Sequence, residues 1–218
     1  MVRTFTHELL EFEELDCDTQ EDGRTYVTPN GNVYPSITTC LNHLSADIIA
    51  EWRDRIGHEE ADAIVFQAAN RGTALHSCVE RYLNNKEIAA ATPLVRMNFN
   101  DIKPFIDKHI GIIYALEAPL YCDELGVAGR VDIIAEWDGE PAIIDIKTSG
   151  KPKREEWCTG YFMQEEFYAM AVEELKGFRI KKLVTVIAVD KGPAQIIVQD
   201  RGVWNTPMRE AILMHKNG

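Results

Sequence analysis

The chain has 218 residues, of which 45% are hydrophobic and 27% charged, and its formal net charge is −12. This length suits one domain with a full hydrophobic core, and the composition is that of an ordinary globular protein. The negative charge argues against a protein that coats nucleic acid tightly, because phosphate binding needs a basic surface.

Neither a membrane segment nor a disulfide framework is expected. The apolar stretch 111–116 is too short to span a bilayer, and the first eight residues lack the apolar core of a signal peptide. The cysteines are odd in number and form no CxxC pair, which favours free thiols over disulfides or a zinc ribbon. We therefore expect a cytoplasmic protein without a membrane partner.

The N-terminal part is predicted to be an acidic segment followed by a hairpin and helices. We expect one domain, 1–218, in which residues 1–23 form an acidic segment that is solvated or serves as an arm. Its acidic residues are Glu8, Glu11, Glu13, Glu14, Asp16, Asp18, Glu21 and Asp22. The Asn30-Gly31 pair predicts a turn between strands at 24–28 and 33–34.

Helices are expected next. Ser36 or Thr38 is the predicted N-cap of a helix that runs to about residue 55. A second helix begins near residue 58, residues 71–73 interrupt it, and 74–83 form another helix or its continuation. A further helix is predicted at 99–110, after Pro93.

The second half of the chain alternates strands and helices. Strands are predicted at 112–122, 127–137, 140–147, 182–190 and 195–199. Helices are predicted at 154–176, where Gly177 ends the helix, and at 206–216. This order predicts an α/β fold with a central mixed sheet, an antiparallel hairpin and flanking helices.

The hairpin 127–147 carries the most informative residues. Asp138-Gly139 predicts a two-residue turn, from which Ile133 faces Ile144 and Asp132 faces Asp145. Directly opposed carboxylates lie about 4.5–5.5 Å apart at their β-carbons and destabilise a sheet unless a cation lies between them. Lys147 shares their face because side chains alternate along a strand. Hard oxygen ligands favour Mg²⁺ or Mn²⁺.

These residues resemble the motifs of a known family. Gly129-Arg130-Val131-Asp132 followed by Asp145-Ile146-Lys147-Thr148-Ser149 is similar to the second and third motifs of the PD-(D/E)xK nuclease superfamily. Its RecB-like branch is the closest match, with similarity to phage exonucleases and to the mitochondrial genome maintenance exonuclease. The resemblance implies a restriction-endonuclease-like core. It also implies that Asp132, Asp145 and the Ile146 backbone carbonyl bind metal while Lys147 assists the attacking water.

Two helices supply the remaining candidates. The segment 71–80 resembles the family's first motif, and there His76 and Glu80 lie four residues apart on one helix face as candidate metal ligands. Gln164 and Tyr168 resemble the family's QxxxY motif, whose side chains can hold a phosphate or orient the lysine and a water. Tyr34 to Thr39 also resembles phage members, although no role follows from the sequence.

The basic loop between these motifs is the candidate DNA-binding segment. Hydroxyls and cations suited to phosphate oxygens are provided by Thr148, Ser149, Lys151, Lys153 and Arg154. Nearby aromatic residues that could stack on bases are Trp157, Tyr161 and Phe162. The alternative is a solvated loop followed by ordinary core aromatics.

The resemblance implies a metal-dependent DNA exonuclease with one or two Mg²⁺ or Mn²⁺ ions, favouring single-stranded or end-containing DNA in recombination, repair or degradation. A recombination or replication protein is a possible partner. The alternatives are an endonuclease of the same fold and a catalytically silent DNA-binding module.

A non-nucleic-acid metal hydrolase is disfavoured, since the chain has no HExxH motif. Some relatives carry an iron–sulfur cluster, but no cysteine follows Cys158, so no iron–sulfur cluster is expected.

Overall fold

The computed structural model of the chain describes residues 3–20, 23–88 and 91–217. Its framework is a five-stranded sheet in the order β4-β5-β6-β7-β8, where β6 and β7 are parallel and the other neighbours antiparallel. The strands are β4 (Ile110–Cys122), β5 (Val127–Trp137), β6 (Glu140–Ser149), β7 (Lys182–Val189) and β8 (Gln195–Asp200). The predicted α/β fold with a mixed central sheet is confirmed.

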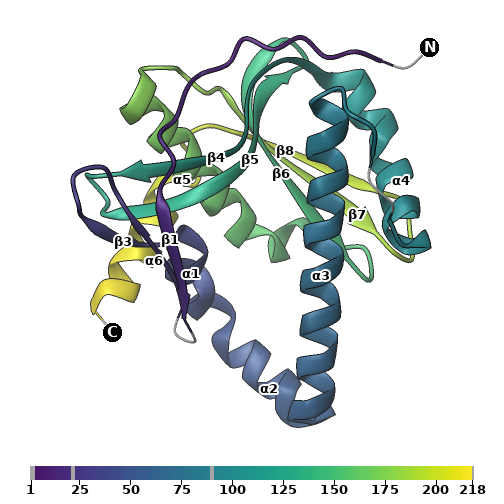
Figure 1. Ribbon diagram of the computed structural model, residues 1–218. Helices are drawn as coiled ribbons and strands as arrows, with labels where there is room; N and C mark the ends of the chain where they lie inside the picture. The colour runs from purple at the N-terminus through teal and green to yellow at the C-terminus, as the bar shows by residue number, and fades with distance from the viewer. Residues whose placement is uncertain (1–2, 21–22, 89–90, 218) are drawn as a thin grey trace.

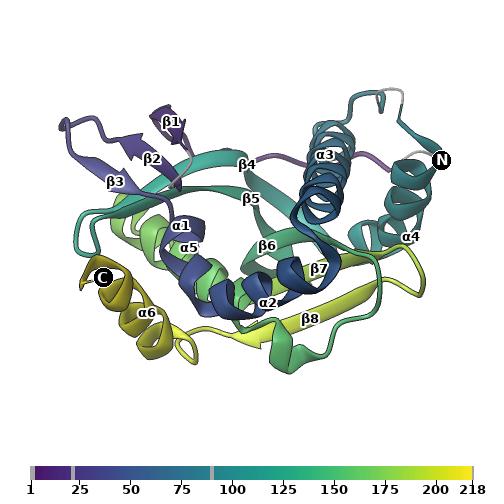
Figure 2. The same ribbon diagram turned by 90° about the horizontal axis from the view of Figure 1, so that it is seen from below.

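Helices cover both faces of this sheet (Figures 1 and 2). They are α1 (Ile37–Leu41), α2 (Ala46–Ile56), α3 (His58–Leu83), α4 (Pro93–His109), α5 (Thr159–Lys176) and α6 (Asn205–Asn217), with short 3-10 turns η1 (Asn42–Ser45) and η2 (Glu155–Trp157). Both faces can be buried because neighbouring strand residues are apolar on each side. Ile133 and Ile144 belong to the cluster under α3 and α4, whereas Ile134 and Ile143 pack under α5.

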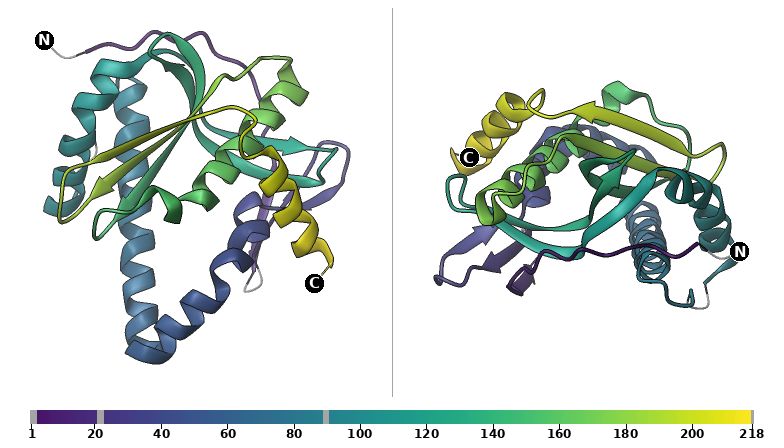
Figure 3. Two further views of the ribbon diagram at one scale, coloured as in Figure 1. Left: turned by 180° about the vertical axis from the view of Figure 1, so that it is seen from behind. Right: turned by 90° about the horizontal axis from the view of Figure 1, so that it is seen from above.

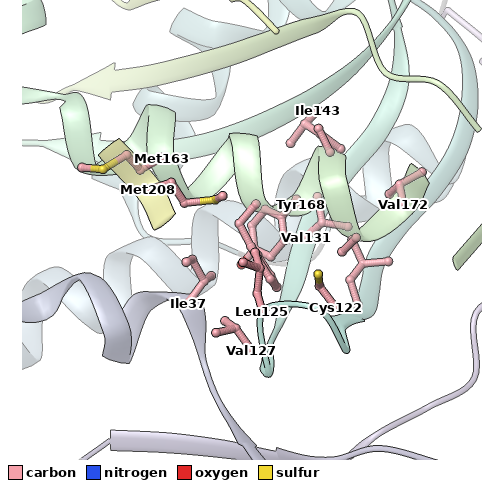
Figure 4. Packing of buried hydrophobic residues seen from close by; sticks show 14 of the residues in the cluster. Ile37, Cys122, Leu125, Val127, Val131, Ile143, Met163, Tyr168, Val172 and Met208 are labelled. Carbon is pink, nitrogen blue, oxygen red and sulfur yellow. The ribbon is translucent and has the colours of Figure 1, made fainter. Parts of the chain in front are cut away.

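The core under α5 also reaches the second motif. Figure 4 shows Tyr168 of α5 beside Val131 of β5, with Ile37 of α1 on the same side of the cluster. Ser36 is the N-cap of α1, as predicted, because its hydroxyl accepts a hydrogen bond from the Thr39 amide at 3.0 Å. The helix expected to reach residue 55 is divided into α1, η1 and α2.

Helix α3 is continuous through residues 71–73, so the structure favours a continuation over a separate helix. Together with α2, its N-terminal half stands away from the sheet (Figure 1). Ala61 is the one buried residue between positions 46 and 72, all of which are described. The C-terminal half of α3, by contrast, packs against α4 and β6.

The N-terminal segment is not a free arm. A small sheet is formed by β1 (Asp16–Gln20), β2 (Gly23–Val27) and β3 (Val33–Pro35), of which the β2–β3 hairpin was predicted and β1 was not. Before β1 the chain runs along β4 (Figure 3), where the Glu8 amide donates to the Ile113 carbonyl and Phe5 is buried. The acidic side chains Glu21 and Asp22 lie outside the described residues.

Among the described residues, no helix combines the length and the apolar character that crossing a membrane would require.

Candidate active site

The catalytic hairpin follows the predicted register for most of its length. Asp138 and Gly139 form the turn with φ of 53° and 78°, and the ladder runs from Trp137–Glu140 to Ile133–Ile144. It ends there, so the predicted pairing of Asp132 with Asp145 is wrong. The Asp132 carboxylate accepts the Ile146 amide at 2.8 Å, which replaces the backbone bond that would continue the ladder.

The carboxylate directly across the sheet from Asp132 is Glu117 of β4. The pairs Leu116–Ile133 and Ala118–Val131 flank this position and fix the register. Glu117 has a φ of 49°, an uncommon backbone for a residue with a side chain. Its carbonyl accepts a hydrogen bond from Arg130. A like-charge conflict of the kind predicted for Asp132 and Asp145 therefore also arises between Asp132 and Glu117.

Sequence reasoning missed Glu117, although the sequence contained a signal for it. Cys122 of β4 pairs with Val127 of β5 at the loop between the two strands. Glu117 lies five residues before Cys122 and Asp132 lies five residues after Val127, so the same register pairs Glu117 with Asp132. The same register count that was applied to the hairpin at Asp138-Gly139 would have found this pair. Glu117 lies outside the family motifs, in a strand that they do not cover.

His76 joins α3 to these two acids. Its Nε2 lies 2.7 Å from the Ile146 carbonyl oxygen, and its Nδ1 lies 3.4 Å from Asp132 and 3.8 Å from Glu117. His76, Glu117 and Asp132 each offer one ligand atom, and these three atoms lie within 4.8 Å of one another. Burial lowers the pKa of His76, but Asp132 and Glu117 outweigh it and raise that pKa to about 10. Without a metal, a proton on the imidazole balances the acids.

Lys147 and Asp145 form the second part of the site. The Lys147 Nζ lies 2.8 Å from Oδ1 and 2.6 Å from Oδ2 of the buried Asp145. Asp145 and Asp132 outweigh burial and raise the pKa of Lys147, which is therefore a cation that donates hydrogen bonds. Burial raises the pKa of Asp145 to about 6 although Lys147 opposes it. The two acids and the lysine therefore form one charge-coupled group.

A hydrogen-bond chain continues from Lys147 into α5. The Lys147 Nζ donates to Gln164 Oε1 at 3.2 Å, and Gln164 Nε2 donates to the Tyr168 hydroxyl at 3.1 Å. Both α5 residues are largely buried. The two residues of the QxxxY resemblance therefore support the lysine and also line the cavity in front of it.

One cavity of about 380 Å³ brings the candidates together. The predicted site residues on its lining are His76, Asp132, Lys147, Gln164 and Tyr168. Glu117 and Arg130 also line it, and so do residues of β2 and of the start of α1. Asp145 lies behind Lys147, and the Ile146 carbonyl is held by His76.

The structure places Glu80 apart from this group. It lies four residues beyond His76 on α3, is half-buried, and belongs neither to the cavity lining nor to the three-residue ligand cluster. Glu117 occupies the place beside His76 that the sequence assigned to Glu80.

The basic loop is partly committed to internal contacts. Ser149 donates to the Lys151 carbonyl, the Lys153 backbone bonds to Gln195, and Arg154 pairs with Glu156. Thr148 lies half-buried beside Gly72 of α3, and the Lys151 side chain is exposed.

The aromatic residues after this loop have different environments. Trp157 is 61% exposed and Tyr161 is half-buried beneath Lys147 and Lys153. Phe162 is buried against Trp204, so the stacking role considered for it is wrong, because a ring inside the core cannot reach a base.

The chain is similar to known proteins. The sequence pattern of the PD-(D/E)XK nuclease superfamily matches residues 51–200. The chain is similar to the human mitochondrial genome maintenance exonuclease 1, with 27% identity over 135 residues. That match covers 56% of this chain and 38% of the human protein. A solved structure of a candidate exonuclease from Eubacterium rectale has a TM-score of 0.47 at 15% identity and covers 69% of this chain and 64% of its own.

Proposed function

The chain belongs to the PD-(D/E)XK nuclease superfamily, and we propose that it is a metal-dependent DNA exonuclease that hydrolyses phosphodiester bonds in single-stranded or end-containing DNA. One observation carries this proposal: the opposed carboxylates of Glu117 and Asp132, the His76 imidazole and the Lys147 cation face one cavity. The RecB-like branch is the assignment that the motifs favour.

The residues present fit a divalent cation. Two opposed carboxylates and an imidazole nitrogen offer oxygen and nitrogen donors within 4.8 Å of one another. The buried Asp145 carboxylate, whose Oδ2 lies 2.6 Å from the Lys147 Nζ, offers a further oxygen donor beside this group. Such a donor set suits Mg²⁺ or Mn²⁺. A bound ion of this kind supplies Lewis-acid stabilisation of the negative charge that develops at the scissile phosphate.

Each residue has a distinct role in this proposal. His76, Glu117, Asp132 and Asp145 would hold the cation, with the Ile146 carbonyl, which accepts a hydrogen bond from His76, as a further candidate oxygen donor. Lys147 orients the attacking water and stabilises charge on the phosphate oxygens. Gln164 and Tyr168 fix the lysine through the hydrogen-bond chain described above.

The DNA strand is proposed to leave along the basic loop. Lys151, Lys153 and Arg154 offer cations to successive phosphates, with Thr148 and Ser149 as hydroxyl donors. Trp157, the most exposed aromatic residue of this loop, is placed to stack on a base. Because the net charge of the chain is −12, most of its surface repels DNA phosphates, and these local cations attract them. The proposed setting is recombination, repair or degradation of cellular or phage DNA in the cytoplasm, with a recombination or replication protein as partner.

The proposal is tested with end-labelled linear and closed circular DNA, single- and double-stranded, in Mg²⁺ or Mn²⁺. We expect the wild type to degrade linear single strands progressively and the Asp145→Ala variant to be inactive. Cleavage of closed circles would instead identify an endonuclease. DNA binding without hydrolysis under every condition would identify a silent binding module and overturn the proposal.

The assignment of Glu117 is tested separately from Glu80. We expect Glu117→Gln to weaken Mn²⁺ affinity at least about ten-fold, since it removes a charged oxygen donor. The matched Glu80→Gln variant should bind Mn²⁺ like the wild type, because Glu80 lies outside the ligand cluster. Titration calorimetry measures both affinities without requiring turnover. The reverse result would return the ligand role to Glu80.

A further inference from the structure

The cavity has a second wall, which the catalytic residues do not form. Arg24 and Tyr26 of β2, and Ser36 and Thr38 around the start of α1, line it together with Lys147 and Asp132. Ser36 and Thr38 belong to the Tyr34 to Thr39 segment, to which the sequence resemblance gave no role. The small N-terminal sheet therefore contributes directly to the active-site cavity.

This wall is held firmly against the catalytic sheet. Tyr26 is 2% exposed and packs with Leu15 and Ala128, and Ser36 forms a bridge to Ala128 of β5. Hydrogen bonds hold both backbone groups of Arg24. Its amide donates to the Thr39 hydroxyl at 3.0 Å, and its carbonyl accepts a hydrogen bond from the Ser36 amide at 2.7 Å. The backbone that carries the Arg24 guanidinium is thus set in place before any ligand arrives.

Arg24 differs from Arg130, the other arginine of the cavity. Arg130 is paired with Glu14 and bonded to the Glu117 carbonyl, so its charge is used inside the protein. Arg24 donates through Nε to the Thr19 hydroxyl at 3.2 Å and forms no ion pair with a carboxylate of residues 3–20, 23–88 or 91–217. Arg24 lines the cavity, and no carboxylate among the described residues takes up its charge.

Hydroxyl groups accompany this cation. The exposed Thr38 hydroxyl lies 2.8 Å from the buried Ser36 hydroxyl, which also lies 2.8 Å from that of Thr39. A guanidinium and hydroxyls that line the same cavity match phosphate, since both donate to its oxygens. The cavity volume of about 380 Å³ suits one nucleotide-sized group, not a duplex.

The wall is also close to the chemistry. Lys147, Gln164 and Tyr168 form a hydrogen-bond chain in the lining of the cavity. The Tyr168 ring lies over Gly129, which is the β5 neighbour of Ala128, where the small sheet is attached. A phosphate on Arg24 would thus lie in the same cavity as the Lys147 cation.

We propose that Arg24, with the Thr38 hydroxyl, binds the phosphate adjacent to the scissile phosphate in the substrate strand and so positions the strand for cleavage. This inference rests on the proposed nuclease function and names a residue pair that determines where the strand sits.

The Arg24→Gln variant tests the cation, and Thr38→Val removes the hydroxyl at nearly constant shape. We expect Arg24→Gln to raise KM for a single-stranded oligonucleotide about ten-fold, the effect of losing one charge-assisted phosphate contact, with kcat little changed. The slope of log affinity against log salt should also fall by about 0.7, as for one lost contact to a single strand. Thr38→Val should raise KM less.

A modified substrate localises the contact. A neutral methylphosphonate at the phosphate adjacent to the scissile bond should lower kcat/KM of the wild type but not that of Arg24→Gln, which has already lost the contact. The control Arg179→Gln removes the same charge from an exposed residue that lines a different cavity beyond the end of α5, and it should retain the wild-type KM.

Two outcomes separate the possible failures. Equal KM and salt slope for wild type and Arg24→Gln, or equal sensitivity of both to the methylphosphonate at every flanking position, would overturn the role of Arg24 while leaving the nuclease function intact. Failure of the wild type to hydrolyse any DNA would overturn the nuclease function instead. The salt dependence of binding, measured by fluorescence anisotropy without turnover, would then still decide whether Arg24 contacts a phosphate.

Discussion

Gly129 shows how one missing side chain shapes the site. A β-carbon at this position would lie 2.9 Å from Cε1 and 3.1 Å from the hydroxyl of Tyr168, and 3.3 Å from Ile37. Tyr168 is buried and accepts from Gln164, so it has little room to retreat. Displacing its ring would disturb the hydrogen bonds that hold Lys147.

We therefore expect Gly129→Ala to lower kcat at least about ten-fold and to cost about 1–3 kcal/mol of stability, the usual range for overpacking. Steady-state kinetics and urea unfolding measure the two effects. The control Gly160→Ala adds a methyl group in α5 where nothing lies within 4 Å and should leave kcat unchanged. Wild-type kcat in Gly129→Ala would show that the Tyr168 position does not matter.

Glu165 is a buried acid that the proposed reaction does not use. It is fully buried behind Gln164, and its Oε1 accepts from the Thr185 hydroxyl. Burial, reinforced by Asp145, raises its pKa well above the ordinary value of 4.5. The folded protein therefore keeps a proton that the unfolded chain loses, and stability falls as pH rises from 4.5 toward the raised pKa.

Glu165→Gln keeps the shape and the bond to Thr185 but cannot ionise. We expect this variant to gain stability relative to the wild type as pH rises from about 5 to about 8, since it lacks the cost of ionising a buried acid. Urea unfolding across this range, with EDTA present, measures the difference. The exposed Glu156→Gln variant should show no such trend, and a constant difference for Glu165→Gln would contradict the assignment.

At the scale of single residues, the motifs predicted which residues form the site, but they did not predict how its candidate ligands are arranged. His76, Asp132, Lys147, Gln164 and Tyr168 were named from the sequence, and all five line one cavity. Glu117 and Arg24 lie in strands outside the motifs, and only the pairing of β4 with β5 and the docking of the small sheet bring them to it. A register count from the β4–β5 loop reaches Glu117, whereas the docking of the small sheet, which brings Arg24 to the cavity, leaves no local pattern in the sequence.

Among the elements, α3 combines two different environments in one helix. Its C-terminal half contributes Leu75, Cys78, Val79 and Leu83 to the core, whereas its first 13 residues bury only Ala61. Local opening is easier where few apolar contacts must be broken. The two halves should therefore differ in stability although the hydrogen-bond ladder is continuous.

Hydrogen exchange measures this difference. We expect amides of residues 62–70 to exchange at least about ten-fold faster than those of 75–83, because the first group opens locally and the second only with the core. Amides near Ile102 and Ile106 of α4, both fully buried, serve as the protected reference. Uniform protection along α3 would mean that α2 or a partner stabilises the projecting half.

The elements were predictable where their residues are periodic. The strands of the main sheet and α5 follow from alternation, helical spacing and the Asp138-Gly139 turn, whose geometry also fixed the register as far as Ile133–Ile144. Strand β1 was missed because all five of its side chains are exposed, so its sequence has no apolar alternation. The end of the ladder at Asp132 was missed because a side chain, not a turn, interrupts it.

In the molecule as a whole, the site is where separate elements meet. Its candidate ligands come from α3 (His76), β4 (Glu117), β5 (Asp132) and β6 (Asp145). Like charges at this junction oppose folding unless a proton or a cation compensates them. A bound cation would therefore stabilise the whole fold and not a single loop.

We expect Mn²⁺ at about 100 times its dissociation constant to add about 2.7 kcal/mol of stability. For a domain of this size that corresponds to a rise in melting temperature of roughly 5–10 °C. Calorimetric melting in Mn²⁺ or EDTA at equal ionic strength measures the shift. Asp132→Asn, which removes a central ligand, should lose most of it, whereas Asp101→Asn on the exposed face of α4 should keep it. An equal shift in Asp132→Asn and wild type would mean that the ion binds elsewhere, since only a ligand at the junction couples these four elements.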